Sequence, residues 1–339
     1  MMGTELMHFF VLFLAGIMAG NGNPQIRTVH SEIRRPLTLR FAGDCLFSNY
    51  YSFDPLDTAG FALSSCDVLR SADIAMVNLE GPITDRGNAR IKPYTFRMSR
   101  RALAELKAGG VDIVNIANNH VSDFGSEGIW DTIKDLDSAG ILHVGAGVTD
   151  ASAYQPAIIS RPGWRIAFFG YYAGDEALIP SAHSAGVAVR SLRNITKAIE
   201  AVKHNVDAVV INLHWGDENS TQPDPNQRIF AHALIDAGAD IVIGHHPHVW
   251  QGVESYHGAI IAYSLGNFIF GGNSKSSYPT GVLEIQLSDD GASYRYIPVL
   301  LDHWKIRVLN GANADMSIAY MRGLSSNFSD LEHSSKERQ

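Results

Sequence analysis

Short apolar runs alternate with helical patterns along most of this chain, and that alternation limits the possible folds more than any other feature. Runs with the length of strands lie at 37–43, 73–79, 111–117, 165–171, 207–213, 240–245 and 259–265. Helical patterns lie between several of them, at 99–110, 128–140, 192–204 and 225–240. Strands that alternate with helices predict an α/β domain, and two further strands at 281–287 and 295–301 extend it.

The sequence has no internal repeat and no break in composition, which favours a single domain over 37–310. Residues 21–36 are polar and are interpreted as a linker. The C-terminal tail, 311–339, is polar after Ser325, and we expect it to be frayed.

An apolar stretch near the amino terminus, from Met7 to Met18, has the length of a signal-peptide core. Residues 1–20 are therefore predicted to be a signal peptide or a membrane anchor, which places the protein in the periplasm or on the outer face of the cell membrane. Glu5 and the absence of a preceding Lys or Arg depart from the usual positive start. A misassigned start with a loose tail is the alternative.

The composition excludes some partners. Hydrophobic residues make up 45% and charged residues 18%, as in soluble globular proteins, and the net charge is −8. With no run of Lys or Arg, nucleic acid is not expected as a partner. The two cysteines, Cys45 and Cys66, are too few for a zinc ribbon and are interpreted as free thiols.

Residues of metal-ligand type follow most of the predicted strands. Each type has an ordinary explanation alone, since Asn-Asn favours loops and a single His is more often structural. Parallel strands end at one edge of a sheet, however, so these side chains can meet there. The set comprises Asp44, Asn78, Glu80, Asn118, Asn119, His120, His214, His245, His246 and His248.

Carboxylate, amide and imidazole donors without cysteine suit one or two divalent ions such as Mn, Fe or Zn. Such ions activate water and polarise a phosphoryl or acyl oxygen. Other chemistries have less support, because the sequence has no G-x-S-x-G elbow, no Cys-His arrangement and no G-x-G-x-x-G loop.

Several motifs together resemble the CapA/PGA-cap family of capsule and poly-γ-glutamate biosynthesis proteins, from about Leu37 to Phe270. They are FAGDCLF, NLEGPIT, ANNHVSDFG, GILHVGAG, NLHWGDE, DAGADIVIGHHPHVWQGVE and IAYSLGNFIF. That family is similar to calcineurin-like metallophosphoesterases. The resemblance implies a four-layer α/β sandwich in which two mixed β-sheets are flanked by helices, with a dinuclear metal site.

The resemblance also implies roles for individual residues. His120 is expected to donate a proton or to stabilise developing charge, and Glu80 to bridge the metals. The expected metal ligands are Asp44, Glu80, Asn119, His214, His246 and His248. Position beside these residues, apart from the resemblance, predicts the substrate contacts Asn78, Asn118, His245, Glu218 and Asn267. Lys92 and Arg97 are interpreted as parts of a solvated loop.

One position departs from the phosphoesterase pattern. Asp44-Cys45-Leu46 stands where Asp-x-His is usual, so dinuclear occupancy and phosphatase activity do not follow from the resemblance. The first hypothesis is a metal-dependent hydrolase or transferase of the cell envelope that acts on a γ-glutamate polymer or a phosphorylated precursor. The second is a non-catalytic subunit that works with other membrane-bound polymer synthase subunits. A phosphodiesterase or phosphatase of small phospho-substrates ranks last.

Overall fold

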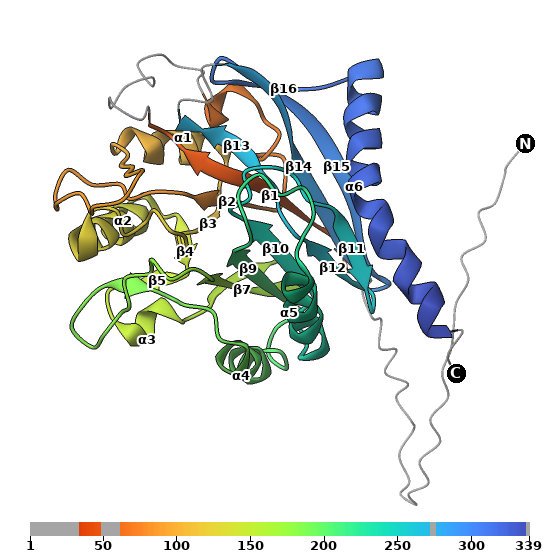
Figure 1. Cartoon of the computed structure of the whole chain (residues 1–339), viewed down its shortest axis with the longest axis horizontal. Coiled ribbons are helices and arrows are strands. Elements are labelled where there is room, and N and C mark those ends of the chain that lie inside the picture. The colour runs from red at the N-terminus through yellow and green to blue at the C-terminus, as the bar shows by residue number, and fades with distance from the viewer. Residues whose placement is uncertain (1–33, 49–61, 272–275, 337–339) are drawn as a thin grey trace, which may run out of the picture. The chain divides into compact units, whose positions relative to one another are not determined.

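The computed structural model describes residues 34–48, 62–271 and 276–336. The proposed signal or anchor, 1–20, and nearly all of the linker lie outside the described residues. Two mixed β-sheets dominate this part of the chain (Figure 1). The predicted strands and helices are all present, with ends that differ by a few residues.

The first sheet has parallel strands at one side and long antiparallel strands at the other. β1 lies at its middle, where it pairs with β2 and β13 in parallel and with β14 in antiparallel. In spatial order the strands are β16 (Lys305–Val308), β15 (Gly291–Asp302), β14 (Ser277–Ser288), β1 (Leu37–Leu46), β2 (Ile74–Leu79), β3 (Ile113–Asn115) and β4 (Leu142–Val144), with β13 (Asn267–Phe270) beside the end of β1.

The second sheet is built around the parallel strands β7, β9, β10 and β12. Its order is β11 (Val253–Tyr256), β12 (Ala259–Ala262), β10 (Ile241–His245), β9 (Ala208–His214), β7 (Trp164–Tyr172) and β6 (Ala157–Arg161). A small antiparallel pair joins β5 (Ala146–Gly147) and β8 (Gly186–Val187).

The buried residues form three clusters, and these reveal the layers. One contains Phe41 and Ile243 and fills the space between the sheets. A second lies between the first sheet and the helices α1 (Arg101–Gly109) and α2 (Gly125–Ala139). The third lies between the second sheet and α4 (Leu192–Val202) and α5 (Pro225–Asp236). The predicted four-layer α/β sandwich is therefore confirmed. Two shorter elements complete the list, the 3-10 helix η1 (Leu63–Ser65) and α3 (Asp150–Ala153).

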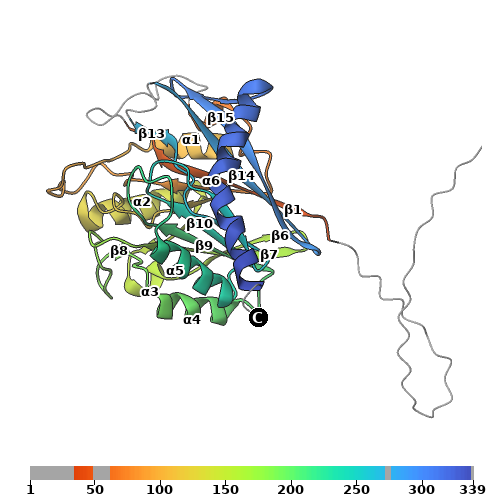
Figure 2. The same cartoon turned by 45° about the vertical axis from the view of Figure 1, so that its right-hand side comes forward.

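The expected frayed end after Ser325 is wrong as far as Lys336, because α6 (Ala312–Lys336) continues through it. Figure 2 shows this helix crossing in front of β14 and β15. Its buried Met321, Leu324 and Phe328 attach it to two of the hydrophobic clusters. The apolar residues at 321, 324 and 328 share one helical face. The polar overall composition of this segment conceals that face in the sequence. No helix among the described residues is long and apolar enough to span a membrane.

Candidate metal centre

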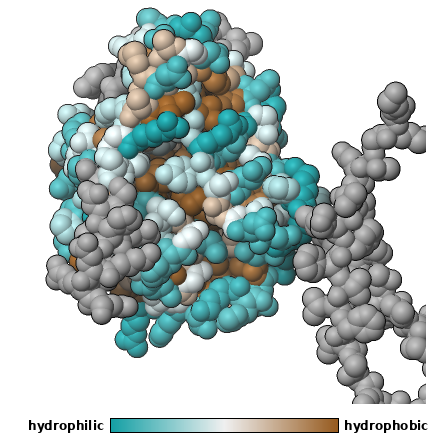
Figure 3. Space-filling view, turned by 90° about the vertical axis from the view of Figure 1, so that its right-hand side faces the viewer, coloured by the Kyte–Doolittle hydropathy of each residue, from teal (hydrophilic) through white to brown (hydrophobic). Residues whose placement is uncertain are grey.

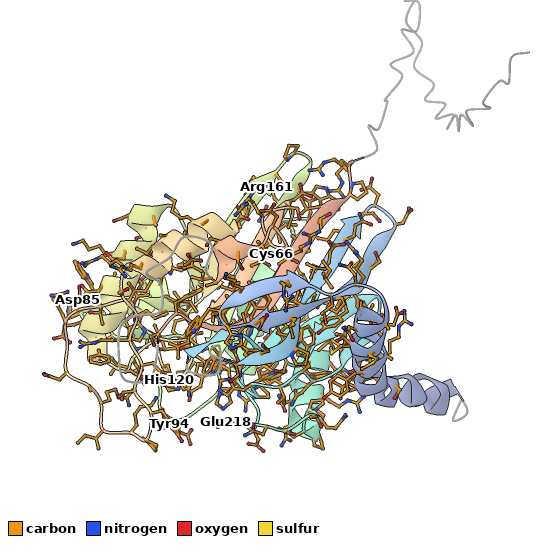
Figure 4. All side chains as sticks on the ribbon, turned by 90° about the horizontal axis from the view of Figure 1, so that it is seen from above. Cys66, Asp85, Tyr94, His120, Arg161 and Glu218 are labelled. Atoms are coloured by element: carbon orange, nitrogen blue, oxygen red, sulfur yellow. The ribbon has the colours of Figure 1, made fainter. Side chains whose placement is uncertain are left out.

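The residues expected to hold metal meet where the parallel strands of both sheets end. Asp44 lies near the end of β1, and Glu80 follows β2 directly. His214 ends β9, and His246 and His248 lie in the loop after β10. The third strand, β3, leads to Asn119 and His120. Figure 4 shows His120 and Glu218 on the same side of the molecule.

Two glycines allow these chain segments to approach closely. A Cβ at Gly43 would lie 1.9 Å from the carbonyl oxygen of Gly266, and one at Gly244 would lie 1.9 Å from that of Tyr263. Each glycine directly precedes a polar residue of the site, Asp44 or His245. Only a residue without a side chain lets both strands pack against the 263–266 segment.

Two groups of ligand atoms share one carboxylate. Asp44, Glu80 and His214 form one group, and Glu80, His246 and His248 form the other, each with its ligand atoms within 4.8 Å of one another. Glu80 Oε1 lies 3.9 Å from His214 Nε2 and 3.7 Å from His248 Nε2. Glu80 is therefore the carboxylate that the two candidate ligand groups have in common.

The cluster contains buried polar atoms that no protein group satisfies. Glu80 is completely buried, and its Oε1 has no hydrogen-bond partner among the described residues. The Nδ1 atom of His246 is also buried without such a partner. Such atoms are costly to bury unless something binds them. Asn119 adds an amide oxygen, which lies 2.9 Å from His214 Nε2. Carboxylate, imidazole and amide donors fit Mn, Fe or Zn.

Charge and backbone geometry agree with this interpretation. Burial and the charge of Asp44 raise the pKa of Glu80 well above its usual range. Burial opposes protonation of His248, yet Glu80 and Asp44 raise its pKa to about 10, so the cluster attracts positive charge. His246 and His248 have φ of 98° and 59°, in the left-handed region that costs non-glycine residues energy. Strain of this kind gathers at functional sites.

His120 belongs to a separate arrangement beside these ligands. Its Nδ1 lies 2.7 Å from Asp123 Oδ2, and its ring packs on Phe96 with centroids 4.2 Å apart. Asp123 Oδ1 lies 2.9 Å from Lys92 Nζ, which also donates to the carbonyl oxygen of Asn119 at 2.8 Å. Burial lowers the pKa of His120, although Asp123 opposes this.

Sequence reasoning missed Asp123, and the solvated-loop interpretation is wrong for Lys92, whose side chain is only 9% exposed. The sequence contained one indication of this contact, because Asp123 lies only three residues after His120.

Most of the expected substrate contacts bond to the protein instead. Asn78 donates to Asp44 Oδ1 at 2.9 Å and to Glu80 Oε2 at 3.2 Å, while its own oxygen accepts from Asn115. Asn118 accepts from the backbone N–H groups of His120 and Val121. Both asparagines are fully buried. Their contacts are those of residues that hold other protein groups in place, not those of residues that face a substrate.

The other three expected contacts differ in exposure. His245 is 1% exposed, and its Nδ1 lies 3.4 Å from Asp44 Oδ1. Asn267 Oδ1 lies 2.9 Å from His248 Nδ1 and fixes that ring. Glu218 is exposed in the loop after β9, so it can face a bound molecule.

The departure in the first motif has a structural counterpart. Strand pairing shifts at Asp44, which turns its carboxylate into the cluster. Cys45 and Leu46 are both fully buried in the hydrophobic cluster under α1 and α2. Cys45 and Cys66 are free thiols, as expected. Leu46 therefore supplies no substitute for the missing histidine.

Comparison with known proteins agrees with the sequence resemblance. The model of the family described as "Bacterial capsule synthesis protein PGA_cap" matches residues 38–272. The "Capsule biosynthesis protein CapA" of Bacillus anthracis is 33% identical over 237 residues, 66% of this chain and 57% of that protein. The "PGA biosynthesis protein CapA" of Bacillus subtilis (strain 168) is 29% identical over 289 residues, 83% of this chain and 75% of that one. The match thus spans little more than half of the first relative.

Among solved structures, the crystal structure of a hypothetical protein from Thermus thermophilus superposes with a TM-score of 0.50 at 15% identity. The match covers 78% of this chain and 98% of that one. This likeness concerns the fold alone.

Proposed function

The chain belongs to the bacterial capsule synthesis protein family PGA_cap, and we propose that it acts in the synthesis of a γ-glutamate polymer as a metal-dependent hydrolase. The observation that carries the proposal is the pair of ligand groups that share Glu80, with His120 beside them but outside both. A site that served only to stabilise the fold would not need an additional buried histidine held by its own carboxylate.

One or two divalent ions held by Asp44, Glu80, Asn119, His214, His246 and His248 would supply an activated water and polarise the bond to be cleaved. The chain's own residues do the rest. Asn78 holds Asp44 and Glu80 in their positions, and Asn267 holds His248. Such supporting hydrogen bonds fix ligand orientation and strengthen metal binding.

His120 is the proton donor in this proposal. Its Nδ1–H bonds to Asp123, so in the protonated ring Nε2 carries the proton that passes to the leaving group. Asp123 stabilises this charged form, and burial, which lowers the pKa of His120, favours release of the proton. Lys92 in turn holds both Asp123 and the backbone of Asn119, which couples the donor to the metal ligands.

The proposed substrate is a γ-glutamate polymer, which the name of the Bacillus subtilis relative supports, or a phosphorylated precursor, which the proposed metal chemistry supports. The chain is proposed to be exported and to work with other membrane-bound subunits of a polymer synthase. A fusion of residues 1–20 to a reporter that is active only outside the cytoplasm should be active. A reporter that remains in the cytoplasm would contradict export.

A second candidate is a non-catalytic assembly or export subunit that keeps a metal for stability. Leu46 favours it, because a buried leucine stands where phosphoesterases have a ligand.

The deciding experiment combines metal analysis with two substitutions. Purified protein should contain one or two equivalents of Mn, Fe or Zn and should hydrolyse an aryl phosphate or a γ-glutamate polymer. In strains that depend on this protein, His246→Ala should abolish polymer under either candidate. His120→Ala should do so only if the site is catalytic, so normal polymer with His120→Ala would establish the subunit. Absence of metal after reconstitution would exclude both metal-dependent candidates.

A further inference from the structure

A groove begins at the metal centre and runs over the long strands to helix α6. Its first part, about 530 Å³, is lined by the metal-centre residues His248 and Asn267 together with Tyr278 and Tyr320. Its second part, about 360 Å³, continues beside α6. The two parts share Trp250, Pro279 and Tyr320 as walls. Cavities of this size hold small organic ligands.

Apolar and aromatic side chains predominate in both parts of the groove. Leu300, Leu309 and Met316 line the second part, which also contains Asn313 and Ser317. The hydroxyl groups of Tyr278 and Tyr296 donate to backbone carbonyls at 3.0 and 2.9 Å, so neither needs a ligand as its partner. No described residue that lines either part is Asp, Glu, Lys or Arg.

Trp250 is a wall that both parts of the groove share, although only 7% of the residue is exposed. Its indole Nε1 is buried and has no hydrogen-bond partner among the described residues.

We propose that this groove binds the hydrocarbon chain of an anionic amphiphile whose phosphate head reaches the metal centre. This deepens the proposed function, because it selects a phosphorylated precursor with an apolar tail over a free γ-glutamate polymer. A polymer with a carboxylate on each residue would bring many negative charges into a groove whose described lining has no Lys or Arg and, away from His248 at the metal centre, no cation to pair with them. Burying such charges unpaired is costly. Met316 and Tyr320 are 69% and 56% exposed, so an apolar chain would cover surface that is now in contact with water. Figure 3 shows this face, where apolar residues lie between hydrophilic ones.

The test uses the full chain and alkyl phosphates from hexyl to dodecyl, below the concentrations at which they form micelles. Affinity measured by calorimetry should rise about fourfold for each added methylene that the groove buries. Tyr320→Glu should remove most of that gain and lower the affinity for dodecyl phosphate by at least about 100-fold. Ala319→Glu adds the same charge to an exposed neighbour that lines neither part of the groove, and it should leave the gain intact. Met316→Glu replaces Tyr320→Glu if the latter lowers the melting temperature.

The titrations are repeated with metal-loaded and chelator-treated protein. A dependence on chain length that persists without metal supports the groove even if hydrolysis fails. An affinity independent of chain length overturns the groove, and hydrolysis of an aryl phosphate by the same sample would leave the proposed function intact. Equal effects of Tyr320→Glu and Ala319→Glu would also overturn it. So would a wild-type dimer that Tyr320→Glu dissociates while dodecyl phosphate binding is unchanged, since a second copy would then be the occupant.

Discussion

Acidic residues stand at both ends of the parallel strands, and their surroundings differ. At the amino ends, one aspartate directly precedes each of β2, β3, β9 and β10. Each carboxylate accepts a backbone N–H from the neighbouring strand at 2.7–2.9 Å. Three of the four also pair with an arginine. The four are Asp73, Asp112, Asp207 and Asp240.

At the carboxyl ends, Asp44 and Glu80 are fully buried, and the charged partners recorded for them among the described residues are histidines. Figure 4 shows the two ends, with Arg161 on one side of the molecule and His120 on the other. This difference shows that the presence of an acidic residue at a strand end does not tell whether it supports the fold or belongs to the candidate metal centre. Each structural carboxylate accepts a strand N–H group, whereas Glu80 at the site keeps a buried oxygen, Oε1, without a hydrogen-bond partner among the described residues.

The same chemical change at each end provides the strongest test of this comparison. Glu80→Gln removes the carboxylate common to both ligand groups, so metal affinity should fall more than about 100-fold, beyond the loss usual for supporting residues. Elemental analysis and isothermal titration measure this. Asp112→Asn is the matched control at the amino end and should retain its metal. Equal metal content in the two variants would refute the site.

His120→Ala should lower turnover by about 10²–10⁴-fold and leave metal content unchanged, because His120 donates a proton and binds no ion. Steady-state kinetics and metal analysis of one preparation check both parts. If metal is lost together with turnover, His120 is a ligand and the division between ligands and proton donor is wrong.

Asp112→Ala should destabilise the protein by about 1–3 kcal/mol without affecting the metal. It removes the acceptor of the Ala75 N–H and of the Nη2 group of Arg161. The melting temperature should fall by about 2–4 °C for each kcal/mol, as measured by calorimetry. Asp290→Ala, in the exposed turn between β14 and β15, is the control and should have little effect.

The smallest effects concern the pH dependence of stability, where two amino-end aspartates should differ in sign. Burial raises the pKa of Asp73, but hydrogen bonds from Arg35 and from the Thr38 N–H lower it below its usual value overall. Its stabilisation is therefore present above the pKa of the unfolded chain and is lost as pH falls through the folded value. Burial raises the pKa of Asp240, so its contribution is lost as pH rises through the folded value.

Denaturant unfolding of Asp73→Asn and Asp240→Asn between about pH 3 and 7 measures this. The stability of the wild type relative to Asp73→Asn should increase with pH, and relative to Asp240→Asn it should decrease. If both stability differences changed with pH in the same direction, the hydrogen bond from Arg35 would not explain the opposite pKa shifts of Asp73 and Asp240.

The sequence predicted the alternation of strands and helices well because apolar runs and helical patterns are local signals, whereas the four layers were implied by the resemblance to the family. Runs such as 207–213 and 240–245 are apolar nearly throughout, as expected for parallel strands that are covered on both faces. It did not predict α6, since a polar composition hides an apolar face whose partner, β15, is identified only in the folded chain.

The sequence by itself determined which residue types follow each strand, and it therefore predicted the set from Asp44 to His248 as one cluster. Only the tertiary structure decided which of these residues are candidate metal ligands, which support the ligands and which surround His120. It placed Glu80 in both ligand groups, turned Asn78 and Asn118 towards protein atoms, and joined Lys92 and Asp123 to His120. The physical reason is that a motif specifies donor chemistry locally, whereas a hydrogen-bond partner or a shared ligand depends on side chains that distant strands bring within a few ångströms.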